Sequence, residues 1–156
     1  MNSNNLWNKA KKVHIQTTTD IIGNFNLGFD NKIPEEVKAE LCNFVSWVEK
    51  NFHLPVTLWV DFEYKHYLVR RDGKRVGFLF YWADFSSYPL FNDSKDIPML
   101  RLSVRTEYSS IDEILISFIE GISYYFAWIC NVLDTNYTPD EDEVEEIFQE
   151  YMKSKL

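Results

Sequence analysis

At residues 117–128 the chain reads SFIEGISYYFAW, and this run decides how the fold is organised. It lies within a longer apolar stretch, Ile111 to Leu133, whose hydrophobic residues recur every three or four positions, as on one face of an α-helix. Within residues 114–133 the only charged side chain is Glu120. We therefore expect a long, mostly buried helix that carries a single carboxylate.

An apolar stretch of about 20 residues is also long enough to cross a bilayer. A carboxylate at position 120 would then lie near the bilayer midplane, at a cost of about 3 kcal/mol. Both flanks of the stretch are acidic, so no excess of Lys or Arg sets an orientation. The sequence therefore predicts that the chain does not contact a membrane.

The rest of the chain predicts an α+β fold with an N-terminal helix, an antiparallel sheet of about four strands, the long buried helix and a C-terminal acidic helix. The first helix begins at Pro34, and the acidic helix begins with Thr138 as N-cap and Pro139 as its first residue. Alternating apolar residues and the Asp72-Gly73 turn signal predict the strands at 56–64, 67–71, 74–82 and 99–105.

One boundary, between residues 33 and 34, follows from this pattern. Residues 1–33 form a poorly defined N-terminal segment, in which residues 23–28 have the composition of a loop and residues 17–19 of a short strand. Residues 34–156 form a single α+β domain of ordinary size.

The composition narrows the kinds of partner. The 156 residues carry a formal net charge of -8, which disfavours nucleic acid and favours a basic protein as partner. The first residues are polar and hold no apolar signal core, so we expect a cytoplasmic protein. The chain contains many aromatic residues: 12 Phe, 9 Tyr and 5 Trp. We therefore expect some aromatic surface to be exposed, and such surface often marks a binding groove.

The run from Ile119 to Trp128 resembles the active-site helix of small bacterial zincin-type metallopeptidases, in which an HExxH motif precedes an aromatic-rich segment. The order of the predicted elements around it is also similar. This resemblance implies that Glu120 occupies the position of the catalytic glutamate. It further implies that Ile119 and Ser123 occupy the positions of the two zinc-binding histidines, and that Glu143 is the candidate third ligand.

The sequence departs from that family at the ligands themselves. Zinc is bound through the lone pairs of His, Cys or carboxylate side chains. Ile119 has none to offer, and the Ser123 hydroxyl is a poor substitute. We therefore expect a zincin-like scaffold that binds no metal or other cofactor and lacks catalytic activity.

These observations predict a non-catalytic cytosolic interaction domain on a zincin-like scaffold, with a protein as partner. Two alternatives stay open: a hydrolase that uses Glu120 as its base, and a small acidic protein of the immunity or antitoxin type. The expected contact surface is the groove beside the central helix together with the polar-aromatic loop at residues 83–96. The candidate binding residues are Tyr88, Phe91, Glu120, Tyr124 and Glu143.

Overall fold

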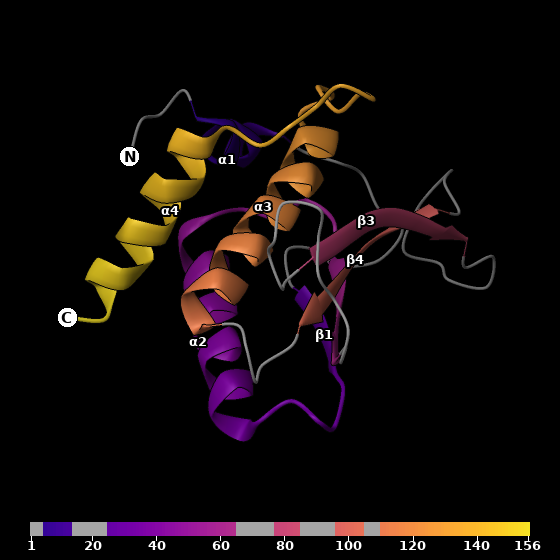
Figure 1. Cartoon of the computed structure of the whole chain (residues 1–156). Helices are drawn as coiled ribbons and strands as arrows, with labels where there is room; N and C mark the ends of the chain where they lie inside the picture. Colours follow the sequence, from indigo (N-terminus) through magenta and orange to yellow (C-terminus); the bar gives the residue numbers. More distant parts are fainter. Residues whose placement is uncertain (1–4, 14–24, 65–76, 85–95, 105–109) are drawn as a thin grey trace.

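The computed structural model describes residues 5–13, 25–64, 77–84, 96–104 and 110–156 (Figure 1). The predicted strand at 67–71, its turn and the strand at 17–19 lie outside these ranges. In chain order the elements are α1 (Leu6–Lys9), the 3-10 turn η1 (Ala10–Lys12), β1 (Phe25–Phe29), α2 (Glu35–Asn51), β2 (Leu58–Tyr64), β3 (Gly77–Asp84), β4 (Asp96–Val104), α3 (Ile111–Ile129) and α4 (Glu141–Ser154).

The α+β class is confirmed, but the prediction of an antiparallel sheet is wrong. The described strands form one sheet in the order β1-β2-β4-β3. Strand β2 pairs in parallel with both β1 and β4, and only β3, at the edge, runs antiparallel to its neighbour. A parallel pair needs a crossover connection, and helix α2 supplies it between β1 and β2. Strand β4 then inserts between β2 and β3, so strands that follow one another in sequence are not all neighbours.

The prediction of a loop at residues 23–28 is also wrong, because residues from Phe25 onward form strand β1. Asn26 and Gly28 are residue types that are depleted in strands, which hid the strand from the sequence pattern. The backbone pairing with β2 offsets the low strand propensity of these two residues. In the register of that pairing, Gly28 lies opposite Asp61. An added Cβ at Gly28 would lie only 2.7 Å from the Asp61 carboxylate, so a larger residue at this position would require the exposed Asp61 side chain to turn aside.

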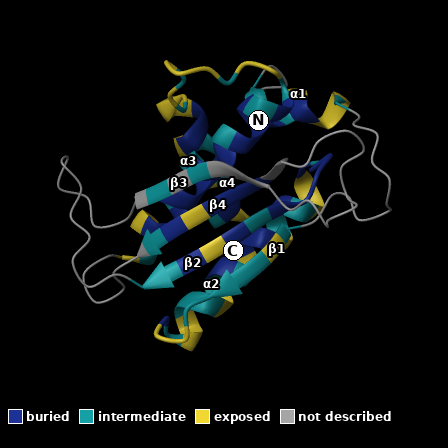
Figure 2. Ribbon diagram, turned by 90° about the vertical axis from the view of Figure 1, so that its right-hand side faces the viewer, coloured by how far each residue is buried: buried dark blue, intermediate teal, exposed yellow. Residues whose placement is uncertain are grey.

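The helices cover one face of the sheet. Figure 1 shows α2 and α3 next to the sheet and α4 on their far side, and in Figure 2 the opposite face of the sheet is turned to the viewer. The burial of β2 alternates accordingly: Leu58, Val60 and Phe62 are buried beneath the helices, and Asp61 is exposed on the other face. On that face Arg101 of β4 forms a salt bridge of 3.2 Å with Glu63.

Helix α3 is the centre of the core, as the sequence predicted. The ring of Phe118 contacts Phe62 of β2, Phe44 of α2 and Phe25 of β1, with ring centroids 5.1, 5.5 and 6.1 Å apart. One side chain of the helix therefore packs against three other elements. Further along, the hydroxyl of Tyr125 donates to the carbonyl of Val56 and accepts from its amide at 3.1 Å, which satisfies the backbone just before β2.

Helix α3 ends before Leu133, the predicted end, because Asn131 adopts a left-handed backbone conformation with φ of 60°. The amide of Val132 donates to the carbonyl of Ala127 at 2.8 Å, and that of Asn131 to Trp128 at 3.1 Å. This pair of bonds is the Schellman motif that closes a helix, with asparagine in the place that glycine usually takes.

The predicted start of helix α4 is wrong by about two residues. Asp140, and not Thr138, is the N-cap, and its carboxylate accepts from the amides of Asp142 at 2.9 Å and Glu143 at 3.3 Å. A carboxylate at this position also interacts favourably with the helix dipole. Residues 138 and 139 therefore belong to the connection between α3 and α4.

The segment at residues 5–13 shares the core with the rest of the chain. The side chain of Trp7 is fully buried, with its ring against Phe52 and Phe126 at centroid distances of 5.1 and 5.0 Å. Its indole Nε1 donates to the hydroxyl of Ser123 at 3.0 Å. Helix α1 is thereby fastened to α3 at the end from which α4 departs (Figure 1).

Gly121 allows α3 to approach strand β4 closely. An added Cβ would lie 2.7 and 2.9 Å from the two terminal carbons of Leu100, which is buried. Alanine stabilises an exposed helix interior by about 1 kcal/mol relative to glycine, but overpacking of a core costs about 1–3 kcal/mol. We therefore expect Gly121→Ala to lower the free energy of unfolding in urea by about 1–2 kcal/mol.

The matched control for Gly121→Ala is the double variant that also carries Leu100→Val, which removes the atoms nearest to the new methyl group. The double variant is expected to lose less free energy of unfolding than the sum of the losses of its two single variants. A Gly121→Ala protein as stable as the parent would show that α3 has room to move away from β4.

Candidate functional site

One stripe of helix α3 borders two pockets. Ile116, Glu120, Tyr124 and Trp128 follow one another at intervals of four residues and are all partly exposed. Side chains at this spacing lie above one another on one face of a helix. Most of the other side chains of α3 are buried. The stripe is therefore the side of the central helix that a ligand can reach.

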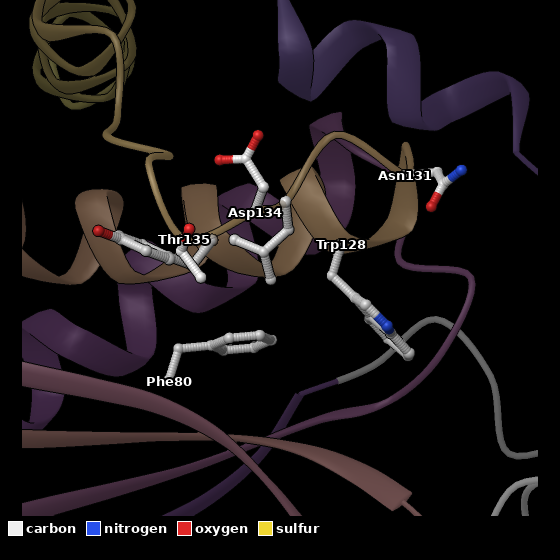
Figure 3. Close-up of a pocket in the computed structure, with 7 residues that line it drawn as sticks. Phe80, Trp128, Asn131, Asp134 and Thr135 are labelled. Carbon is white, nitrogen blue, oxygen red and sulfur yellow. The ribbon is translucent and has the colours of Figure 1, made fainter.

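The larger pocket, here called the aromatic pocket, has a volume of about 400 Å³, within the usual range for binding sites. It lies between strand β3, the C-terminal end of α3 and the connection to α4. In Figure 3 Phe80 projects from the sheet on one side, and Thr135 and Trp128 lie across from it. Its lining residues are Phe80, Tyr124, Trp128, Asn131, Leu133, Asp134 and Thr135.

The connection that forms the roof of the aromatic pocket is held by its own hydrogen bonds. The Asp134 carboxylate accepts from the amide of Asn136 at 2.8 Å, and the Asp134 carbonyl accepts from the amide of Tyr137 at 3.2 Å. This carboxylate points away from Phe80 in Figure 3. Asp134 therefore shapes the turn over the pocket and adds negative charge at its rim.

The smaller pocket, here called the acidic pocket, has a volume of about 170 Å³ and lies nearer the N-terminal end of α3. Glu120 contributes one carboxylate, and Glu141 and Glu145 of α4 contribute two more. The apolar part of its lining is formed by Ile116, Pro139 and Val144.

Tyr137 of the connection between α3 and α4 packs against α3 at Ser123 and Tyr124. Its hydroxyl donates to the carbonyl of Ser123 at 3.3 Å, and the hydroxyl of Tyr124 donates to the carbonyl of Tyr137 at 3.4 Å. The rings of Tyr124 and Tyr137 meet edge to face at 5.0 Å. Tyr124 also contacts Phe78 of β3 at 5.4 Å. These contacts hold the Tyr124 ring, which lines the aromatic pocket, between β3 and the connection to α4.

The two positions that the zincin resemblance assigns to histidines lie in the core. Ile119 is 0% exposed and Ser123 is 1% exposed. The Ser123 hydroxyl accepts from Trp7 Nε1 and donates to the carbonyl of Ile119 at 2.9 Å. Ser123 therefore faces helix α1, Ile119 lies in the core, and neither is among the lining residues of the two pockets.

Glu143, the candidate third ligand, also faces helix α1. The residue is 6% exposed, and its carboxylate accepts from the amide of Trp7 at 3.4 Å. Burial raises the pKa of Glu143, and the hydrogen bond from Trp7 acts against this rise. The neighbouring carboxylates of Asp140 and Glu146 raise it further. Glu143 thus holds the start of α1 on the surface of α3 and α4.

The raised pKa of Glu143 implies that stability depends on pH. A group with a raised folded-state pKa contributes stability that is present below its unfolded pKa and is lost as pH rises through the folded value. Glutamine keeps an acceptor for the Trp7 amide without the charge. We therefore expect Glu143→Gln to match the parent in urea unfolding near pH 4 and to exceed it at about pH 8.

Glu143→Ala is the control for that prediction because it removes the acceptor itself. It should destabilise the protein by about 1–3 kcal/mol at both pH values, since the Trp7 amide is left buried without this bond. A glutamine variant that is less stable than the parent at high pH would mean that the ionised carboxylate is a net stabiliser of α1.

The structure brings together only part of the predicted binding set. Glu120 and Tyr124 lie on the exposed stripe, Glu143 lies on another side of the helices, and Tyr88 and Phe91 lie outside the described residues. Several residues that line the aromatic pocket were not predicted from the sequence, because they lie on a strand or after the helix and not within the helical pattern. These residues are Phe80, Leu133, Asp134 and Thr135. Trp128 could have been predicted, because it follows Tyr124 by four residues and so lies on the same face of the helix.

Comparison of the chain with models of protein families, with curated proteins and with solved structures finds no match. Within the described ranges, no three His, Cys, Asp or Glu side chains are grouped as a metal site would require. None of the helices that the structure describes is long and apolar enough to cross a bilayer. The function must therefore be argued from the geometry of the α3 stripe.

Proposed function

We propose that this protein is a non-catalytic, cytosolic interaction domain that binds a partner protein along the exposed stripe of α3. The aromatic pocket is the observation that supports this proposal most directly. Its wall combines side chains from β3, α3 and the following connection, with Phe80, Tyr124 and Trp128 as the aromatic members. Aromatic residues contribute much of the binding energy where a partner side chain is buried at an interface.

The surroundings of the stripe support binding over catalysis. Glu120, the candidate base, lines the acidic pocket beside two other glutamates. A hydrolase built on the zincin pattern would need metal ligands beside it, whereas positions 119 and 123 are enclosed in the core. An immunity-type protein remains a specific form of the same proposal, because it too acts by covering a partner's surface.

Photo-crosslinking in the native host tests the proposal. A photoreactive amino acid at Thr135, which is exposed at the rim of the aromatic pocket, is expected to capture a defined protein. The same group at Lys50, exposed on α2, serves as the control and should not capture it. Capture should disappear when Trp128→Ala is added. Equal capture from both positions, or none from position 135, would overturn the proposal.

A further inference from the structure

The charge of the two pockets indicates the chemistry of the partner. Among their described lining residues, Glu120, Asp134, Glu141 and Glu145 are acidic and none is basic. The chain as a whole carries a net charge of -8, so its field favours cationic surfaces. We infer that the partner presents a basic extended segment, with an apolar side chain in the aromatic pocket and a Lys or Arg side chain in the acidic pocket. This inference rests on the proposed function.

The spacing of the pockets gives the spacing of the two anchors. Ile116 and Glu120 line the acidic pocket, and Tyr124 and Trp128, each eight residues later, line the aromatic pocket. Eight residues of helix span about 12 Å. An extended segment covers about 13 Å in four residues, and side chains four residues apart lie on the same face of it. The apolar and basic anchors are therefore expected four residues apart.

The two pockets contribute differently to recognition. The aromatic pocket removes apolar surface from water, which supplies most of the affinity. The glutamates of α4 are exposed, so their attraction for a cation is screened by salt and acts mainly on the association rate and on the choice of partner. Binding should therefore weaken as salt rises without disappearing.

Fluorescence anisotropy with labelled synthetic peptides tests the inference on the full chain. One peptide carries a Trp and a Lys four residues apart among Gly and Ser. A second has the same composition with the Lys next to the Trp, and a third has Glu in place of Lys. The first is expected to bind about tenfold or more tightly than either of the others, a difference of about 1.4 kcal/mol.

Paired charge reversals supply the protein controls. Glu141→Lys with Glu145→Lys should weaken binding of the first peptide about tenfold or more. Glu35→Lys with Glu36→Lys makes the same change in net charge at exposed positions of α2 and should leave the affinity within about twofold. Thr135→Trp, at the rim of the aromatic pocket, should also weaken binding.

The possible results distinguish a failure of this inference from a failure of the proposed function. Equal binding of the three peptides, or equal loss in the two charge-reversed proteins, would overturn the inference as non-specific attraction. A partner captured from position 135 that binds without any effect of Glu141 and Glu145 would leave the proposed function standing and reject the basic segment. Failure of the crosslinking itself would reject both.

Discussion

Trp7→Ala is expected to lower the free energy of unfolding by about 3–5 kcal/mol, the range for removing a large aromatic side chain from a core. Trp7 is fully buried and contacts Phe52 of the segment after α2 and Phe126 of α3. The change would leave a cavity and remove the indole hydrogen bond to Ser123. Urea unfolding followed by circular dichroism measures the loss.

Trp7→Phe separates the packing of the indole from its hydrogen bond. It keeps an aromatic ring in the core and removes only the donor to Ser123. Trp7→Phe should therefore lower the free energy of unfolding clearly less than Trp7→Ala does. In a double-mutant cycle with Ser123→Ala, the two changes should be non-additive by about 0.5–1.5 kcal/mol. A cost below about 1 kcal/mol for Trp7→Ala would mean that residues 5–13 detach from the core without loss of stability.

The role of Trp7 was beyond the reach of sequence patterns. Helix α1 has four residues, which is too short for an apolar periodicity to be seen. Apart from Leu6, the nearest neighbours of the tryptophan in sequence are polar, and its aromatic partners are more than 40 residues away. The anchoring of this segment depends on Ser123 and Glu143, whose orientation follows only from the packing of α3 and α4.

In the sheet, too, the sequence predicts the local structure of a strand but not which strands lie beside it. The alternation of Val60, Asp61 and Phe62 predicts a strand with one buried face, and the structure agrees. Which strand lies beside it is not encoded in that alternation, because the pattern is the same for either direction of pairing. The insertion of β4 between β2 and β3 brings together residues about 40 positions apart, such as Asp61 and Arg101.

The candidate site could be predicted only in part for a related reason. The apolar run of residues 111–133 identifies a buried helix, but a helix that is apolar on nearly every side does not reveal which side faces a pocket. The exposed stripe carries Ile116, Tyr124 and Trp128, which look like core residues in the sequence. Glu120 was the single polar marker of that stripe, and it does lie beside a pocket.

Ile119→His with Ser123→His is expected to destabilise the protein by several kcal/mol and to create no zinc site in the folded state. The two positions are 0% and 1% exposed. An imidazole at position 123 would have to replace a small side chain beside Trp7, and overpacking a core costs about 1–3 kcal/mol at a single position. A buried imidazole without a hydrogen-bond partner adds a further cost. Urea unfolding with and without Zn²⁺ should show a large loss and no recovery.

Glu120→His with Tyr124→His is the matched pair, shifted by one residue along the same helix. These two positions lie one turn apart on the exposed stripe, so two imidazoles there can share one zinc ion from the pocket side. Glu145, which lines the acidic pocket with Glu120, is a candidate for a third ligand. The folded variant is expected to gain stability as Zn²⁺ is added, as for any ligand that binds only the native state.

The 119/123 pair tests the zincin resemblance, and the 120/124 pair is the control that shows whether exposed histidines on the same helix bind zinc. A zinc-dependent gain for the 120/124 pair, reduced by Glu145→Ala, would show that the exposed stripe can present ligands to one ion, as an exposed pair four residues apart on any helix can, and would not by itself support the resemblance. A zinc-dependent gain for the 119/123 pair would instead require α3 to rotate about its axis, against the packing of Trp7 and Tyr125. No gain for the folded 119/123 pair would reject the resemblance at the positions that the sequence assigned to histidines, because both are enclosed in the core.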